Sequence, residues 1–276
     1  MTVAEFTPIV AAASLAAGLL GSLTGLGGGV IVTPVLTLFL GVDLRYAIGA
    51  SLISAIASSS GAAASYVRDG YSNIRIGMFL EIATTFGALT GAFLSIHISP
   101  SKLSIIFGLV LLQSAWQTMG GRKHPKIPTP DDPLAEKLQL NSSFIDNGLT
   151  RVYKVHRIKT GFGLMFGAGT ISGLLGIGSG SLKVIALDQA MQIPFKVSTA
   201  TSNFMIGVTA AASASVYLGR GYINPAIAMP VVLGVLAGSL LGARLLSRLP
   251  VMLLRRIFAV VVGVMAVQMI VQGIRG

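Results

Sequence analysis

Long apolar runs separated by short polar segments recur along the whole chain. A helix needs roughly 20 apolar residues to cross a bilayer, so this pattern predicts a polytopic membrane protein. The runs lack the alternation of apolar and polar residues that membrane strands show, so the expected fold is all-α. We predict helical segments at about 8–23, 30–42, 46–67, 74–96, 101–119, 161–175, 181–193, 197–218, 225–245 and 252–272.

Two glycine-rich breaks interrupt these runs in register with each other. Gly25-Leu26-Gly27-Gly28-Gly29 is followed, 151 positions later, by Gly176-Ile177-Gly178-Ser179-Gly180. The offset holds without gaps over about 100 residues, which indicates an internal repeat. The chain therefore divides into a first transmembrane repeat at 1–120, a polar loop at 121–160 and a second transmembrane repeat at 161–276.

The polar loop is expected to contain a hairpin and no helix. Asn147-Gly148 lies between segments in which apolar and polar residues alternate, which predicts a β-hairpin within about 142–155. Helix-breaking prolines occur earlier in the loop, at Pro125, Pro128, Pro130 and Pro133.

Basic residues predict the orientation of the chain. The net charge of +11 comes from the loops, so it indicates membrane orientation and not nucleic-acid binding. Loops 121–160 and 244–256 are both basic and should both be cytoplasmic. The counterpart of 244–256 in the first repeat is 93–105, and counting the crossings back from the loop at 121–160 places it outside. Both placements hold only if each repeat crosses an odd number of times. The repeats are then inverted, and both termini lie outside.

Two other arrangements of the breaks bear on this topology. A single long broken helix in each repeat would give four crossings and parallel repeats, which the charge pattern disfavours. Within the inverted topology, the sequence does not distinguish a re-entrant hairpin at each break from two short spans.

Several chemistries are not expected in this chain. It has no cysteine, three scattered histidines and no phosphate-binding loop signature. We therefore expect no metal, no cofactor and no enzymatic activity.

Each break ends one helix and begins another inside the membrane. The N–H groups of a new helix start have no partner within the helix and form a ready anion site. Transporters commonly place such ends near the midplane, facing the substrate. The alternative is that the small residues only allow tight helix packing. The substrate-binding residues predicted here are Gly27, Gly28, Gly29, Gly178, Ser179 and Gly180.

Polar residues at the start of the third segment of each repeat are further candidates for substrate contact. Their hydroxyl and amide groups suit an oxyanion. The alternative is an N-cap or a hydrogen bond between helices. They are Ser51, Thr201, Ser202 and Asn203.

Three ionisable residues lie within apolar segments. Lys183 follows the second break, where a cation would favour an anionic substrate; the alternative is that it snorkels to the interface. Its repeat counterpart is Val32, so this site would be asymmetric. Glu81 is a candidate for proton coupling, and pairing near Arg75 is the plainer interpretation. Asp188 is a weaker coupling candidate.

The paired motifs resemble the sulfite exporter TauE/SafE family of membrane permeases. The resemblance rests on Gly25-Leu26-Gly27-Gly28-Gly29-Val30-Ile31-Val32-Thr33-Pro34, Gly176-Ile177-Gly178-Ser179-Gly180, Gly49-Ala50-Ser51-Leu52 and Ala200-Thr201-Ser202-Asn203-Phe204. It implies an inner-membrane carrier that moves small sulfur-containing anions, such as sulfite or organosulfonates, usually outward. The second break departs from the family pattern, because Ser181-Leu182-Lys183 stands where apolar residues and a proline are typical.

We therefore predict a secondary carrier for a small oxyanion in the lipid bilayer, with protons as a candidate coupling ion. The alternatives are a passive anion channel and a membrane scaffold that acts through the loop at 120–160. The sequence leaves open the anion, the direction of transport and whether the chain forms a homo-oligomer.

Overall fold

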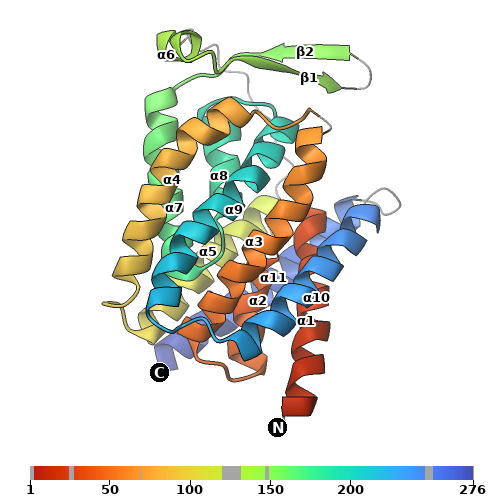
Figure 1. Ribbon diagram of the computed structural model, residues 1–276, viewed down its shortest axis with the longest axis vertical. Helices are drawn as coiled ribbons and strands as arrows, with labels where there is room; N and C mark the ends of the chain where they lie inside the picture. Colours follow the sequence, from red (N-terminus) through yellow and green to blue (C-terminus); the bar gives the residue numbers. More distant parts are fainter. Residues whose placement is uncertain are drawn as a thin grey trace.

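The computed structural model is a bundle of long helices with a small cap at one end (Figure 1). It describes residues 3–24, 28–68, 70–119, 132–146, 149–245 and 251–275. Gly27, Asn147, Gly148 and residues 120–131 and 246–250 of the two basic loops lie outside the described residues.

The helices of the two halves follow the same order. The first half contains α1 (Val3–Thr24), α2 (Gly29–Pro34), the π-helix η1 (Val35–Phe39), α3 (Leu44–Arg68), α4 (Ile74–Leu94) and α5 (Pro100–Met119). The second half contains α7 (Ile158–Leu175), α8 (Gly180–Ile185), the π-helix η2 (Ala186–Ala190), α9 (Phe195–Gly219), α10 (Pro225–Leu245) and α11 (Val251–Arg275). From α2 onward, each element of the first half has a counterpart that begins 151 residues later.

The bundle has the character of a membrane protein. Among the described residues, four helices are long and apolar enough to cross a bilayer: 44–68, 74–94, 158–175 and 256–275. The arm formed by α2 and η1 covers 29–39, which corresponds to roughly 15 Å of helix and is shorter than a crossing. The chain is thus an all-α, multi-pass integral membrane protein.

Each long helix packs against a helix of the other half. The pairs are α1 with α10, α7 with α4, α3 with α9, and α5 with α11. Counterparts such as α1 and α7, or α3 and α9, run in opposite directions along the bundle (Figure 1). Both termini lie at the end of the bundle opposite the cap (Figure 1).

Glycines allow two of these pairs to pack backbone against backbone. A Cβ added to Gly169 of α7 would overlap the Thr84 carbonyl oxygen of α4. The counterpart Gly18 of α1 meets the Val235 carbonyl oxygen of α10 in the same way, again at an offset of 151. Small residues at helix interfaces are the expected means of close approach in lipid.

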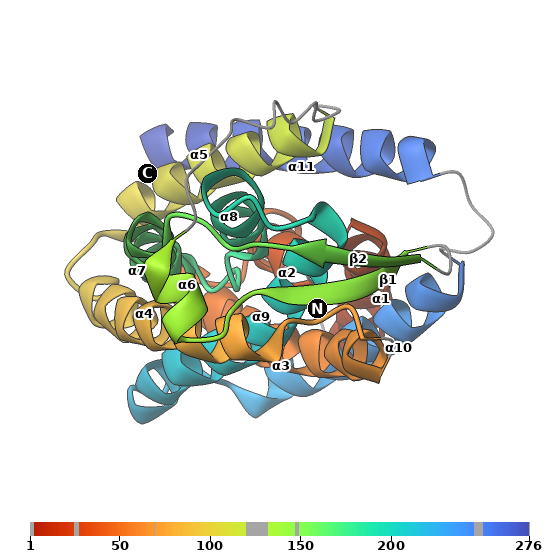
Figure 2. The same cartoon turned by 90° about the horizontal axis from the view of Figure 1, so that it is seen from above.

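The cap lies across the end of the bundle where α3 ends and α4 begins (Figures 1 and 2). It consists of α6 (Pro133–Lys137) and the antiparallel hairpin of β1 (Ser142–Asp146) and β2 (Leu149–Tyr153), which forms where the sequence predicts it. The expectation that prolines exclude a helix is wrong at Pro133. Pro133 occupies the first turn of α6, where its missing N–H is not needed, and Asp132 accepts a hydrogen bond from Leu134 N at 3.0 Å.

Asn73 fastens the cap to the helices. Its Nδ2 donates to Leu140 O and to the Tyr153 hydroxyl, each at 2.9 Å, and its Oδ1 caps α4. Its backbone N–H donates to Thr201 Oγ1 of α9 at 3.0 Å. Burial raises the pKa of the Tyr153 phenol, so this contact is made by the neutral side chain.

Candidate functional site

The second break is a true interruption of helical structure. Gly176 ends α7 with φ 69°, and Gly178 has φ 67°. Ser179 is also left-handed, with φ 46°, a conformation that a residue with a side chain rarely adopts. No side chain caps α8, which begins at Gly180 and continues into η2.

At the first break, α2 packs closely against α3. Gly28 precedes α2, and no side chain caps the start of this helix. A Cβ on Gly29 would lie 2.9 Å from Ser51 Oγ, so glycine is required for the contact between α2 and α3. Gly27 belongs to the same predicted site, but it lies outside the described residues.

Ser51 joins the two breaks. Its Oγ lies 2.8 Å from Gly29 O of the first break and 2.9 Å from Gly176 O of the second, so its one proton is shared between these two carbonyls. Its counterpart Ser202 donates to Gly180 O at 3.1 Å, which repeats the Ser51–Gly29 bond at the offset of 151. Both serines therefore hold a broken-helix start against α3 or α9, which matches the interhelical alternative considered from the sequence.

Thr201 and Asn203 are buried beside Ser202 but make other contacts. Thr201 accepts the bond from Asn73 N described above, so it links α9 to the cap end of α4. Asn203 Nδ2 donates to Thr199 O of its own helix at 3.1 Å.

Lys183 belongs to a buried polar network that is centred on Thr209. Its Nζ donates to Thr209 Oγ1 at 2.5 Å, and Thr209 Oγ1 in turn donates to Glu81 Oε1 at 2.5 Å. Lys183 and Thr209 are 0% exposed and Glu81 is 6% exposed. One hydroxyl therefore connects the cation of α8 with the carboxylate of α4.

This network excludes the plainer interpretations of both charged residues. Lys183 does not snorkel, because its whole side chain is buried. Glu81 does not pair with Arg75, which instead donates to Gln139 Oε1 of the cap at 2.8 Å. Asp188 is also buried, in η2 of the same arm, and is 5% exposed.

Ser179 Oγ and Glu81 Oε2 are among the buried oxygen atoms without a hydrogen-bond partner, as is Ser172 Oγ in the last turn of α7. Buried polar groups are normally paired, so each unpaired one calls for an explanation. The chain thus combines a buried cation, an unpaired carboxylate oxygen and an uncapped helix start in one region.

The network occurs in one half only. The counterparts of Lys183, Thr209 and Glu81 are Val32, Ser58 and Val232. Ser58 Oγ donates to Ala55 O of its own helix at 3.3 Å. The second break consequently carries charge and the first does not.

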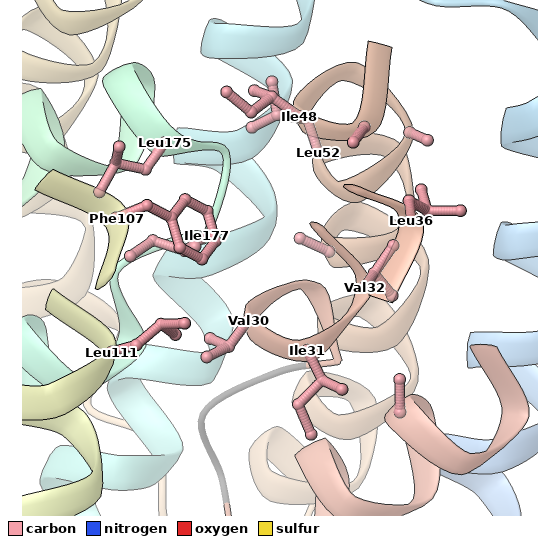
Figure 3. Close-up of a cluster of buried hydrophobic side chains, with 14 of the residues drawn as sticks. Val30, Ile31, Val32, Leu36, Ile48, Leu52, Phe107, Leu111, Leu175 and Ile177 are labelled. Atoms are coloured by element: carbon pink, nitrogen blue, oxygen red, sulfur yellow. The ribbon is translucent and has the colours of Figure 1, made fainter. Parts of the chain in front are cut away.

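Apolar side chains of α2, α3, α5, α7 and the second break form one buried cluster (Figure 3). Leu111 and Phe107 of α5 point toward Val30, which follows the first break, and Ile177, which lies within the second. A charge in such surroundings is poorly solvated, so a single cation can dominate the local electrostatics.

Sequence reasoning identified Lys183 and Glu81 but missed Thr209 and Asn73. Thr209 is one of several hydroxyl residues in α9, and nothing local distinguishes it from the others. The register offered a signal for Asn73, which falls on Asn224 at the start of α10.

A helical multi-pass fold, interrupted helices and a buried charged network are features that membrane transporters share. The model of the family described as "Sulfite exporter TauE/SafE" matches residues 10–269, and the chain belongs to this family. The protein is therefore a membrane transporter.

Curated relatives carry names of the same class. The chain is 28% identical to the probable membrane transporter protein YunE of Bacillus subtilis, over 96% of this chain and 98% of that protein. It is 26% identical to a probable membrane transporter protein of Xylella fastidiosa (strain Temecula1), over 98% and 97%. It is 27% identical to MJ0441 of Methanocaldococcus jannaschii, another probable membrane transporter protein, over 95% of each chain. No solved structure matches the chain.

Proposed function

We propose that the protein is a secondary transporter that moves small sulfur-containing oxyanions, such as sulfite or organosulfonates, out of the cell. The observation that carries the proposal is Lys183, a fully buried cation beside the second break. An intramembrane charge is costly and marks a substrate or ion pathway by default. The family description supplies the expected substrate class.

The anion is held between Lys183 and the start of α8. The first N–H groups of α8 have no partner within the helix, and no side chain caps them. Ser179, whose hydroxyl is buried without a partner, offers a further hydrogen bond. Ser51, Ser202 and the glycines at 28–29 and 178–180 keep both breaks in place around this site.

The two halves of the bundle could move against each other to give alternating access. Counterpart helices run in opposite directions, and each half packs on the other through paired long helices. In inverted-repeat carriers, one half rocks against the other around a fixed site. Here the site would open alternately to the cap end and to the end that carries the termini.

The test is thermal unfolding of the purified protein against sulfite, thiosulfate, sulfate, sulfoacetate, phosphate and acetate at matched ionic strength. A ligand that binds only the folded state raises the unfolding midpoint. We expect a selective rise with a sulfur oxyanion in the wild type and in Lys159→Met, which changes an exposed lysine of α7. The rise should disappear in Lys183→Met, and a Lys183→Met protein that responds like the wild type would refute the site.

A further inference from the structure

We propose that Glu81 is an internal stand-in for the transported anion. When no anion is bound, the carboxylate neutralises Lys183. When the anion binds, the carboxylate takes up a proton and becomes neutral. This inference rests on the proposed function and specifies how the site is regulated. It makes anion binding and protonation of one residue a single event.

The first step is the shared hydroxyl. Thr209 Oγ1 accepts from Lys183 Nζ and donates to Glu81 Oε1, so the two charged groups are held on opposite sides of one oxygen atom. A fully buried cation without a negative partner is strongly destabilising, so Lys183 in its charged form needs either Glu81 or the bound anion beside it.

The second step is that the contact can be released locally. Thr209 Oγ1 also lies 2.9 Å from Met205 O, one turn back in α9. When Glu81 becomes neutral, the hydroxyl can donate to that carbonyl and remain hydrogen-bonded. Lys183 keeps its bond to Thr209 Oγ1 and, no longer neutralised by Glu81, can direct its other N–H groups to an anion at the start of α8.

The third step is the place for the proton. Glu81 Oε2 is buried and has no hydrogen-bond partner, whereas Oε1 accepts from Thr209 and, at 3.4 Å, from Thr85. A carboxylate with one unpaired buried oxygen is poorly stabilised in its charged form. The proton therefore goes to Oε2 without displacing an existing bond.

The other charged groups around Glu81 do not compete for this role. In the described parts of α4, α7, α8, η2 and α9, the only buried charged side chains are Glu81 itself, Lys183 and Asp188. Asp188 lies in η2 and has interactions of its own. The exposed ones lie at helix ends and are Arg75, Lys159, Lys196 and Arg220.

The sign of the pH dependence follows from this exchange. Charged Glu81 competes with the anion for Lys183, so lowering the pH, which adds the proton, tightens anion binding. One proton is taken up for each anion bound. Glu81→Gln mimics the protonated state and should bind the anion tightly at every pH.

The experiment measures binding of sulfate and thiosulfate, whose charges stay constant, by thermal shift at about pH 6 and about pH 8. We expect the wild type and Glu136→Gln, an exposed carboxylate of α6, to bind more tightly at the lower pH. Glu81→Gln should lose this dependence and bind about tenfold more tightly than the wild type at the higher pH. Lys183→Met should bind neither anion.

The outcomes separate the two proposals. If Glu81→Gln keeps wild-type affinities and pH dependence while Lys183→Met abolishes binding, the charge exchange is wrong and the anion site stands. If Lys183→Met binds like the wild type, or no variant binds either anion, both proposals fail.

If Glu81→Gln alone does not fold, the variant that combines Glu81→Gln with Lys183→Met still tests the proposal. If Glu81 is the counter-ion, removing Lys183 as well should restore a higher unfolding midpoint than Glu81→Gln alone. A double variant that is no more stable than Glu81→Gln overturns the proposal.

Discussion

Thr209 is the residue on which the polar network depends. It carries no charge, yet it is the only residue that hydrogen-bonds to both Lys183 and Glu81 among the contacts described. Its methyl group suits the apolar interior, and its hydroxyl places two opposite charges within reach of each other. A residue of this kind determines the geometry of a site without being a ligand.

We predict that Thr209→Val destabilises the protein by about 1–3 kcal/mol, because Lys183 and Glu81 each lose a buried hydrogen bond while the side-chain shape is kept. Thr209→Ser should retain most of the stability. The measurement is the thermal unfolding midpoint in detergent.

Ser58 provides the control for Thr209. It is the counterpart of Thr209 in the first half and bonds only within its own helix in the contacts described, so Ser58→Ala should change the midpoint little. A Thr209→Val protein as stable as the wild type would show that the network contributes nothing to stability.

At the scale of elements, glycine positions decide how closely the helices approach. Gly169 and Gly167 are neighbours on α7 with opposite surroundings. Gly169 meets the backbone of α4, whereas nothing lies within 4 Å of a Cβ added to Gly167.

This pair gives a matched test of helix packing. Gly169→Ala should lower stability by about 1–3 kcal/mol, because α7 and α4 must separate to admit the methyl group. Gly167→Ala should be neutral or stabilising by up to about 1 kcal/mol, because alanine favours the helix. Thermal unfolding of both variants checks this, and equal midpoints would contradict the packing.

Most elements could be predicted from the sequence, because hydrophobic length and glycine position are local signals. The predicted segment 225–245 coincides with α10, and 161–175 lies within α7. The helix α6 was missed because Pro133 was taken only as a breaker, although Asp132 before it is a capping residue.

The site could be predicted only in part. Lys183 and Glu81 stand out because charges are rare in apolar segments. Their meeting through Thr209 depends on how α4, α8 and α9 pack, which one sequence without contacts does not specify. The roles of Ser51 and Ser202 as braces for the breaks likewise appear only when the helices are assembled.

At the scale of the whole molecule, the antiparallel course of counterpart helices predicts opposite sidedness for counterpart turns. The native chain has no cysteine, so single cysteines can be introduced without background labelling. We expect Gly219→Cys to react with an impermeant maleimide in intact cells, and its counterpart Arg68→Cys to react only after lysis. Lys154→Cys, next to the cap, should likewise react only after lysis if the cap faces the cytoplasm. Labelling of positions 68 and 219 from the same side would refute the inverted arrangement.

Carrier-mediated transport of the anion can be measured by counterflow in proteoliposomes. Vesicles loaded with sulfite are diluted into a trace of labelled sulfite, and uptake of label is followed over time. A carrier with its anion site at Lys183 predicts transient, saturable accumulation of label in the wild type and in Lys159→Met, and none in Lys183→Met. Accumulation by Lys183→Met at the wild-type rate would contradict the anion site at Lys183. A linear flux that does not depend on the loaded anion would contradict a carrier.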